Sequence, residues 1–218
     1  DSVINLVGLG LLVSKRRVIV VGRKRQMSER FISSVRRERA LKRGVEIRKG
    51  LRLLPIRPVY LASMAHGGKK NIITIGMFAF FSREPSLMGI GIAPKRHSYE
   101  LIRQSGEFVV NVPTKKLMKA VSICGSKSGR DVDKFAAAKL TPTRGTKVNA
   151  PLIKECPVNI ECRVVKEVET GDHVWFIGEV VATHADKGYS WKRGLLFKWI
   201  GEDGFFYKVG EKIGQHIE

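Results

Sequence analysis

Cysteine is scarce in this chain, and its placement excludes two classes of protein. Cys124, Cys156 and Cys162 are the only three, and no two of them form a C-x-x-C pair. An odd number at this spacing supports neither a disulfide framework nor a zinc site. We therefore expect no bound metal, and a reducing compartment such as the cytoplasm.

Long apolar runs and familiar catalytic patterns are also missing. The N-terminal run at 3–13 is followed by Ser-Lys-Arg-Arg and is too short for a membrane span of about twenty residues. No positive region precedes it, as a signal peptide would require. Its V-G-L-G at 7–10 lacks the third glycine of a dinucleotide fingerprint. No Ser-His-Asp order or pair of carboxylates at helical spacing supports a hydrolase.

Acidic residues are few, and the basic excess is uneven. The net charge is +20, and residues 1–57 hold sixteen basic and four acidic residues, or +12 of that total. We expect a basic helix at 28–43 that ends before Gly44. Such a segment is either a solvated surface or a contact for nucleic acid or another anionic partner. A basic tail binds polyanions without defining what the folded domain does.

The length fits one folded domain with an appendage. Since Arg57-Pro58 opens a strand, we place the boundary near Gly50. Residues 1–50 are then a basic, partly helical or disordered extension, and residues 51–218 are the domain. One hypothesis is that residues 1–26 lie upstream of a native start at Met27.

The domain is predicted to be mainly β, an antiparallel barrel with short helical excursions. A run at 72–81 predicts a strand buried on both faces. Glycines at 67 and 68 predict a hairpin that joins it to a strand at 59–64. At 158–165 alternation predicts a half-exposed strand, with Asn159 and Glu161 outward and Cys162 in the core. Further strands are expected at 87–93, 108–112, 173–183, 195–200 and 205–209, and helices at 99–104, 115–124 and 132–138.

Five separated blocks carry a family resemblance. In order they are N-x-x-T-x-G from Asn71, S-x-E-P-x-L-x-G-I-G-I, S-G-E-F-V-V-N-V-P, C-G-x-x-S-G-R-D-V-D-K-F and G-D-H-x-x-x-x-G-E-V. Together they resemble the flavin reductase-like family of FMN-binding split barrels, over roughly residues 55–207. The resemblance implies an antiparallel split β-barrel that binds FMN.

The residues themselves suggest where such a cofactor would bind. Ser98 opens the expected helix at 99–104, where an anion is favoured, and Arg96 lies two residues before it. A plain helix cap would also explain Ser98. The backbone of Ile73, Ile75 and Met77 can donate to the pyrimidine edge of the ring.

Several positions in the same region are open to two interpretations. The Thr74 hydroxyl has either a neighbouring backbone or a ligand as its partner. Gly89 and Gly91 leave room for a flat ring or for close packing. Cys124 is a buried thiol or, by the resemblance, lies near the flavin. Asp131 and Asp133 are expected to pair with Arg130 and Lys134.

The resemblance assigns further roles. Asn71, Thr74 and Ser98 occupy positions that contact the flavin, and Lys134 and His173 lie around it as candidate catalytic residues. Lys134 would stabilise the anion that forms when the ring is reduced. The position of Met77 often carries an aromatic residue in the family, so ring stacking would pass here to the thioether or to Phe78.

The function that the resemblance implies is an NAD(P)H-dependent flavin or ferric reductase, expected in the cytoplasm. Members of the family usually form homodimers with the flavin near the interface, and the resemblance implies the same here. One alternative is a flavin-based electron carrier that exchanges electrons with a partner protein. A nucleic-acid-binding module acting through the basic extension is an alternative from another class. The sequence leaves NADH against NADPH, and the electron acceptor, open.

Overall fold

We analysed a computed structural model, which describes residues 44–54, 57–200 and 203–210 and the backbone of three N-terminal strands. The chain divides into two compact units, Asp1–Glu46 and Ile47–Glu218. The first contains an antiparallel sheet of β1 (Ile4–Leu6), β2 (Leu11–Ser14) and β3 (Arg17–Val20). The V-G-L-G at 7–10 and the helix predicted at 28–43 lie outside the described residues. Residues 47–50, assigned above to the extension, belong to helix α2 (Ile47–Arg52) of the second unit.

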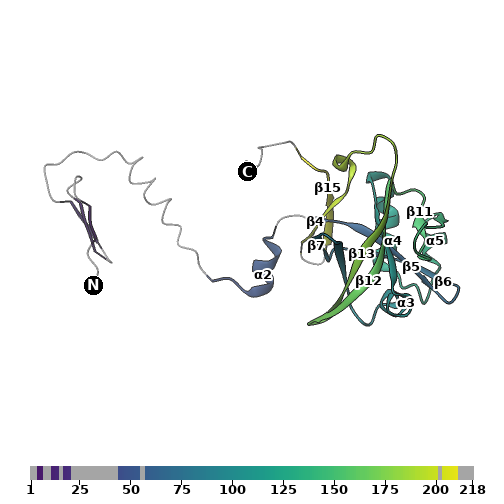
Figure 1. The fold of residues 1–218 in the computed structure, drawn as a ribbon. Helices are drawn as coiled ribbons and strands as arrows, with labels where there is room; N and C mark the ends of the chain where they lie inside the picture. Colours follow the sequence, from purple (N-terminus) through teal and green to yellow (C-terminus); the bar gives the residue numbers. More distant parts are fainter. Residues whose placement is uncertain are drawn as a thin grey trace. The chain divides into compact units, whose positions relative to one another are not determined.

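The second unit is built on a seven-stranded antiparallel sheet with the order β6-β5-β9-β12-β13-β8-β7. Its strands are β5 (Tyr60–His66), β6 (Lys69–Ile75), β7 (Phe78–Arg83), β8 (Ser86–Ile92), β9 (Glu107–Val112), β12 (Val158–Thr170) and β13 (His173–Ala185). Figure 1 shows its two long strands, β12 and β13, side by side. The mainly β, split-barrel prediction is confirmed.

Smaller sheets and short helices complete the unit. The sheet β15-β14-β4 contains β4 (Arg57–Pro58), β14 (Leu196–Ile200) and β15 (Asp203–Tyr207), and a two-stranded sheet pairs β10 (Pro142–Thr143) with β11 (Leu152–Ile153). The helices are α3 (His97–Ser105), α4 (Met118–Ser126) and α5 (Lys134–Ala137), with 3-10 turns η1 (Lys115–Leu117) and η2 (Trp191–Arg193). Among the described residues, no helix is long and apolar enough to cross a membrane.

The hairpin predicted between β5 and β6 is present. Gly67 and Gly68, with φ of 55° and 76°, form its turn. Two consecutive positive φ angles match the right-handed twist of the strands.

The single buried strand predicted at 72–81 is wrong. The chain leaves β6 at Ile75 and starts β7 at Phe78, and these strands lie at opposite ends of the sheet order. A two-residue link between the first and last strands requires the sheet to curl until its edges approach. At that place the Gly91 backbone N–H donates to the Met77 carbonyl (3.0 Å). Since β7 has only one neighbour, it is not buried on both faces, and Phe80 is 61% exposed.

The outward face predicted for β12 is also wrong. Asn159 is 8% exposed and Glu161 0%, whereas Cys162 is buried in the core as expected. The segment 144–153 covers this face. Glu161 accepts backbone hydrogen bonds from three of its residues, and the side-chain amide of Asn159 donates to the carbonyl of Ile153 (3.1 Å). Alternation identified the strand, but it does not show that a loop covers its polar face.

Two apolar clusters position the helices. The first lies among the sheet strands and the inner face of α3, and the second joins β6 to α4 and α5. The helix predicted at 132–138 is shorter than expected, because Asp133 caps α5 by accepting from the backbone N–H groups of Phe135 (2.9 Å) and Ala136 (3.2 Å). Asp133 therefore does not pair with a cation as predicted.

Candidate functional site

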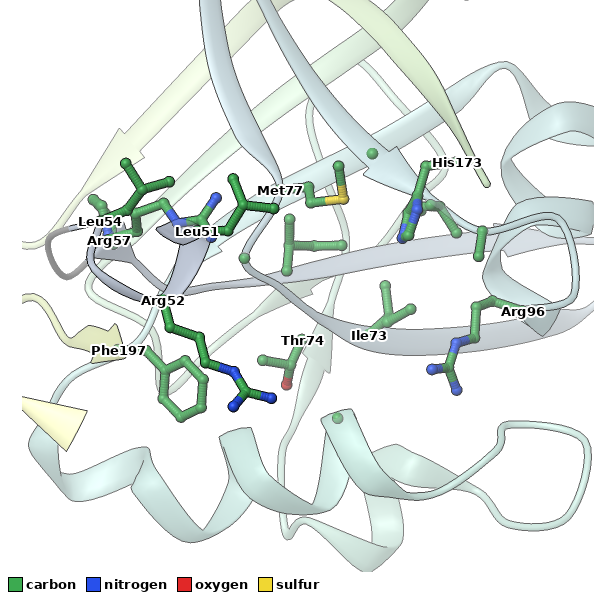
Figure 2. A pocket seen from close by; sticks show the side chains of 17 residues that line it. Leu51, Arg52, Leu54, Arg57, Ile73, Thr74, Met77, Arg96, His173 and Phe197 are labelled. Atoms are coloured by element: carbon green, nitrogen blue, oxygen red, sulfur yellow. The ribbon is translucent and has the colours of Figure 1, made fainter. Parts of the chain in front are cut away.

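A cavity of 460 Å³ opens where β6 ends and β7 begins. We call it the larger cavity, because it exceeds in volume the adjoining cavity described next. Figure 2 shows Arg52 and Phe197 toward one end of it and Arg96 and His173 toward the other. Its wall is mixed, with apolar side chains along the middle and basic ones at both ends. Its described lining is Leu51, Arg52, Leu54, Arg57, Pro58, Ile73, Thr74, Ile75, Gly76, Met77, Gly91, Ile92, Ala93, Arg96, Gly125, His173 and Phe197.

A second cavity of 220 Å³ shares Ile73, Arg96 and Gly125 with the first, so the two adjoin. We call it the basic cavity. Five of its described lining residues are Lys or Arg and none is acidic, which makes it a site for an anion. Its described lining is Asn71, Ile73, Lys95, Arg96, His97, Ser98, Cys124, Gly125, Lys127, Ser128, Gly129, Arg130 and Lys134.

Asn71 and Ser98 form the buried floor of the basic cavity. The Asn71 amide nitrogen donates to the Ser98 hydroxyl (2.9 Å), while the Asn71 Oδ1 atom is buried without a hydrogen-bond partner. A buried acceptor without a partner is costly, and a donor on a bound molecule would satisfy it. Ser98 lies inside the first turn of α3, and Arg96 holds the N-cap position, so the helix-cap interpretation of Ser98 is wrong.

Lys134 is a buried cation at this site. It is 4% exposed, and its Nζ donates to the carbonyl of Cys124 (2.9 Å). The pKa of Lys134 is lowered to about 8, chiefly by burial and to a smaller extent by nearby Arg96, while Cys124 opposes the shift. A group with so few partners is poised to gain an anionic one. Lys134 therefore lines the basic cavity and is not among the described lining residues of the larger cavity.

Glycines let the end of α4 and the loop after it approach β6. A Cβ atom on Gly129 would lie 2.3 Å from Asn71 Oδ1, and one on Gly125 would lie 3.3 Å from the Cβ of Thr74. Any side chain at position 129 would collide with Asn71. The small residues of the C-G-S-K-S-G-R block therefore allow the loop to close over the cavity.

An ion-pair network fixes the rim of the basic cavity. Arg130 pairs with Glu100 of α3 and donates to the carbonyl of Lys95 (3.0 Å), and His97 contacts the same carboxylate (3.3 Å). Hydrogen bonds from Arg130 and then His97 lower the pKa of Glu100. The partner predicted for Arg130, an aspartate of its own block, is thus replaced by Glu100.

Thr74 donates its hydroxyl hydrogen to the carbonyl of Val121 in α4 (2.6 Å). The backbone partner considered from the sequence is therefore present. The oxygen can still accept a hydrogen bond from the larger cavity, which Thr74 lines.

The two glycines of β8, for which the sequence left open close packing or space for a flat ring, have different explanations. A Cβ on Gly89 would lie 2.5 Å from the ring of Phe81, so close packing explains that position. Gly91 lines the larger cavity, under the Met77 side chain at 3.1 Å from its virtual Cβ. Phe78 packs against Tyr60 (centroids 4.6 Å apart) and is not among the lining residues, so Met77 is the side chain that faces a ligand here.

His173 begins β13 and lines the larger cavity on the side of Met77 (Figure 2). Its Nδ1 contacts Asp172 Oδ1 (2.7 Å), and this hydrogen bond lowers the pKa of Asp172. The contact fixes one ring nitrogen of a side chain that is 27% exposed, which leaves the other for a ligand.

All nine residues predicted from the sequence line one of the two cavities. Asn71, Ser98 and Lys134 line the basic cavity, Thr74, Ile75, Met77 and His173 the larger one, and Ile73 and Arg96 line both. Cys124 is fully buried, as one interpretation held, and it also lines the basic cavity. That it lies near a flavin stays a prediction.

The sequence prediction missed several basic residues of the basic cavity and the two arginines, Arg52 and Arg57, that line the larger cavity. Lys95, His97, Lys127 and Arg130 surround the basic cavity. Their clustering in the short segments 95–98 and 127–130 was the available signal. Arg52 and Arg57 gave none, because their distance from the other site residues in the sequence hides their place in the fold.

A curled antiparallel sheet with a basic cavity beside a larger one of mixed lining defines a split-barrel protein. The profile described as "Flavin reductase like domain" matches residues 54–198, and this chain belongs to that family. The resemblance inferred from the five sequence blocks is confirmed.

Relatives and solved structures agree with this assignment. An uncharacterized protein of Archaeoglobus fulgidus is 40% identical over 154 residues, covering 70% of this chain and 86% of its own. The NADH-dependent FMN reductase AsuE2 of Streptomyces nodosus subsp. asukaensis is 28% identical, covering 68% and 79%. The crystal structure of flavoredoxin from Methanosarcina acetivorans matches with a TM-score of 0.71 at 28% identity, covering 81% and 95%.

Proposed function

We propose that this protein is an FMN-dependent oxidoreductase that accepts electrons from NADH or NADPH and passes them to a second acceptor. The observation that carries the proposal is the basic cavity joined to the larger one. It offers Lys134, Arg96 and Ser98 to a phosphate, and the larger cavity offers an apolar wall to a flat ring. AsuE2 is a named NADH-dependent FMN reductase, which supports the same reading.

Each part of FMN has candidate partners in this chain. Lys134 and Arg96 would hold the phosphate, and the orphan Asn71 Oδ1 would accept a hydrogen bond from a hydroxyl of the ribityl chain. Ile73, Met77 and Gly91 would contact the ring. When bound, FMN supplies the redox chemistry, taking a hydride from a dihydronicotinamide together with a proton and releasing two electrons to an acceptor.

The chain's own residues position the reactants and supply the field. His173, at the wall of the larger cavity, would hold a proton near the ring, with Asp172 orienting its imidazole. Lys134 would act through the phosphate, since it lies in the basic cavity, and not on the ring as the sequence suggested.

The test is a titration of the purified protein with FMN and, separately, with riboflavin, in which binding is measured by the quenching of flavin fluorescence. FMN should bind at least tenfold more tightly, because only FMN carries the phosphate that the basic cavity attracts. Equal affinities, or no binding of either flavin, would contradict the proposal. Anaerobic addition of NADH and then NADPH should bleach the bound flavin.

An electron carrier is the second candidate, supported by the fold match to flavoredoxin at 28% identity. A carrier would bind FMN in the same cavities and receive electrons from a protein. Flavin that stays oxidised with both nicotinamides, yet is reduced by dithionite, would favour the carrier.

We also propose a homodimer in the cytoplasm. The edge strand β7 exposes Phe80 (61%) and Phe81 (48%), apolar surface that a second copy of the chain would cover. Light scattering after size exclusion should give twice the monomer mass of 24.4 kDa. A monomer at micromolar concentration would refute the dimer.

A further inference from the structure

Two arginines occupy the end of the larger cavity that is far from the basic cavity. Arg52 is the last residue of α2 and Arg57 the first of β4, and Figure 2 shows both at the end opposite Arg96. Both are exposed. Arg57 pairs through its backbone with Phe197 of β14, but neither guanidinium group forms an ion pair or hydrogen bond with a described residue. No Asp or Glu is among the described residues that line this cavity.

The charge at this end is not explained by FMN. The cofactor has one phosphate group, and the basic cavity around Lys134 already provides its partners. A single phosphate cannot neutralise two cationic ends on opposite sides of a ring site. A second reactant must, however, reach the ring through the larger cavity for electrons to pass, and Arg52 and Arg57 lie along its wall.

We propose that Arg52 and Arg57 bind the phosphate of this second reactant and thereby select phosphate-bearing reactants over others; the proposal rests on the FMN-dependent function above. A guanidinium group binds phosphate through two parallel hydrogen bonds, which a lysine does not reproduce. The phenyl ring of Phe197 in the same wall gives an adjoining flat surface. Arg52 precedes the family match at 54–198, whereas Arg57 and Phe197 lie within it, so this wall is only partly built by the shared domain.

Two sources carry the required phosphate, namely a nicotinamide dinucleotide as donor and free FMN as acceptor. The first arm of the test compares NADH and NADPH with N-benzyl-1,4-dihydronicotinamide, which donates a hydride but has no phosphate. The rate constant for reduction of bound FMN is measured by anaerobic stopped flow. In Arg52→Gln and Arg57→Gln, the rate at low dinucleotide concentration should fall about tenfold, and that with the benzyl compound should stay within twofold.

The second arm reduces the bound flavin with dithionite and compares free FMN with riboflavin as acceptor. Here the rate of electron transfer to free FMN should fall about tenfold in the two variants, and the rate with riboflavin should not change. Loss in the first arm alone identifies the dinucleotide, and loss in the second alone identifies free FMN. Arg48→Gln is the matched control, since it removes one charge from the same helix at a position outside the cavity lining.

Added salt should reduce the preference for phosphate, and Arg52→Lys should recover only part of it. The proposal is overturned if both variants keep the wild-type preference in both arms, or if the phosphate-free reactants lose as much rate as the others. Its failure is distinct from failure of the proposed function, which would be a protein that binds no FMN at all.

Discussion

Lys134 carries its charge on an almost fully buried side chain that lines the basic cavity, so its protonation should control FMN affinity. Burial places its pKa at about 8 without a ligand, and a phosphate dianion beside it would raise that value. Affinity is then full below about pH 8 and decreases as pH rises through the pKa of the bound state. Fluorescence titrations from pH 6 to 10 should show this decrease for FMN and not for riboflavin.

Lys134→Met should remove this pH dependence together with the charge. FMN affinity near pH 7 should fall about 10- to 100-fold, the equivalent of one charge-assisted hydrogen bond. Riboflavin affinity is the internal control and should change little. An FMN affinity that keeps its wild-type pH profile in this variant would assign the titration to another group.

Glu161 is a fully buried carboxylate with a structural role. Burial raises its pKa, but backbone N–H groups of Thr146, Lys147 and Val148 and the His184 ring hydrogen-bond to it and lower the pKa to about 2. Glu161→Gln replaces one acceptor oxygen by a donor, so we expect a loss of about 3 kcal/mol in unfolding free energy at pH 7. Glu167→Gln, on the exposed part of the same strand, should change stability by less than about 0.5 kcal/mol.

The pH dependence of this effect has a defined sign. Because the folded-state pKa is below the ordinary value of 4.5, the stabilisation is present above about pH 4.5 and is lost as pH falls toward 2. Urea unfolding curves of wild type and Glu161→Gln should therefore converge over this range. A difference that stays constant down to pH 2 would show that the carboxylate charge is not the cause.

Residue identity at the site was predictable where a local pattern or family block existed. Asn71, Ser98 and Lys134 were found in this way. The burial of Lys134 in the basic cavity was not predictable, because its hydrogen-bond partner, the carbonyl of Cys124, lies on α4. Glu161 was assigned outward for a similar reason. Alternation gives the face of a strand, and only the tertiary fold shows what covers that face.

At the scale of elements, the loop after α4 controls the volume of the basic cavity. Gly129→Ala places a Cβ 2.3 Å from Asn71 Oδ1, so the loop or the amide must move. Overpacking of this kind costs about 1–3 kcal/mol, and we expect FMN binding to weaken about tenfold. Isothermal titration calorimetry with FMN measures this affinity. Gly44→Ala is the control, because no heavy atom lies within 4 Å of the virtual Cβ at that position. Equal affinities in the two variants would argue against a tight loop.

Element types were predicted well, and their ends less so. The run at 72–81 is apolar on both sides of Gly76, and periodicity cannot distinguish one strand from two that lie at opposite ends of a sheet. The break follows from barrel closure, a property of seven strands together. It also forms the cavity, because Ile75, Gly76 and Met77 line the place where the sheet edges approach.

At the scale of the whole molecule, much of the basic charge lies outside the family domain. Residues 1–57 carry +12 of the +20 net charge, while the family match covers 54–198. A fragment of residues 47–218 keeps α2 with Arg52 and every lining residue of both cavities. It should therefore bind FMN with an affinity within twofold of the full chain.

Binding to polyanions should behave in the opposite way. Removing residues 1–46 takes away +8 of the +20 net charge, so elution from heparin should shift to lower salt, while the full chain shows a steep loss of binding with ionic strength. A shorter fragment of residues 54–218 lacks Arg52. It should bind FMN as the full chain does but lose the preference for phosphate-bearing reactants. If the 47–218 fragment bound heparin as tightly as the full chain, the basic surface of the folded domain would be responsible, and a nucleic-acid role for the domain itself would regain support.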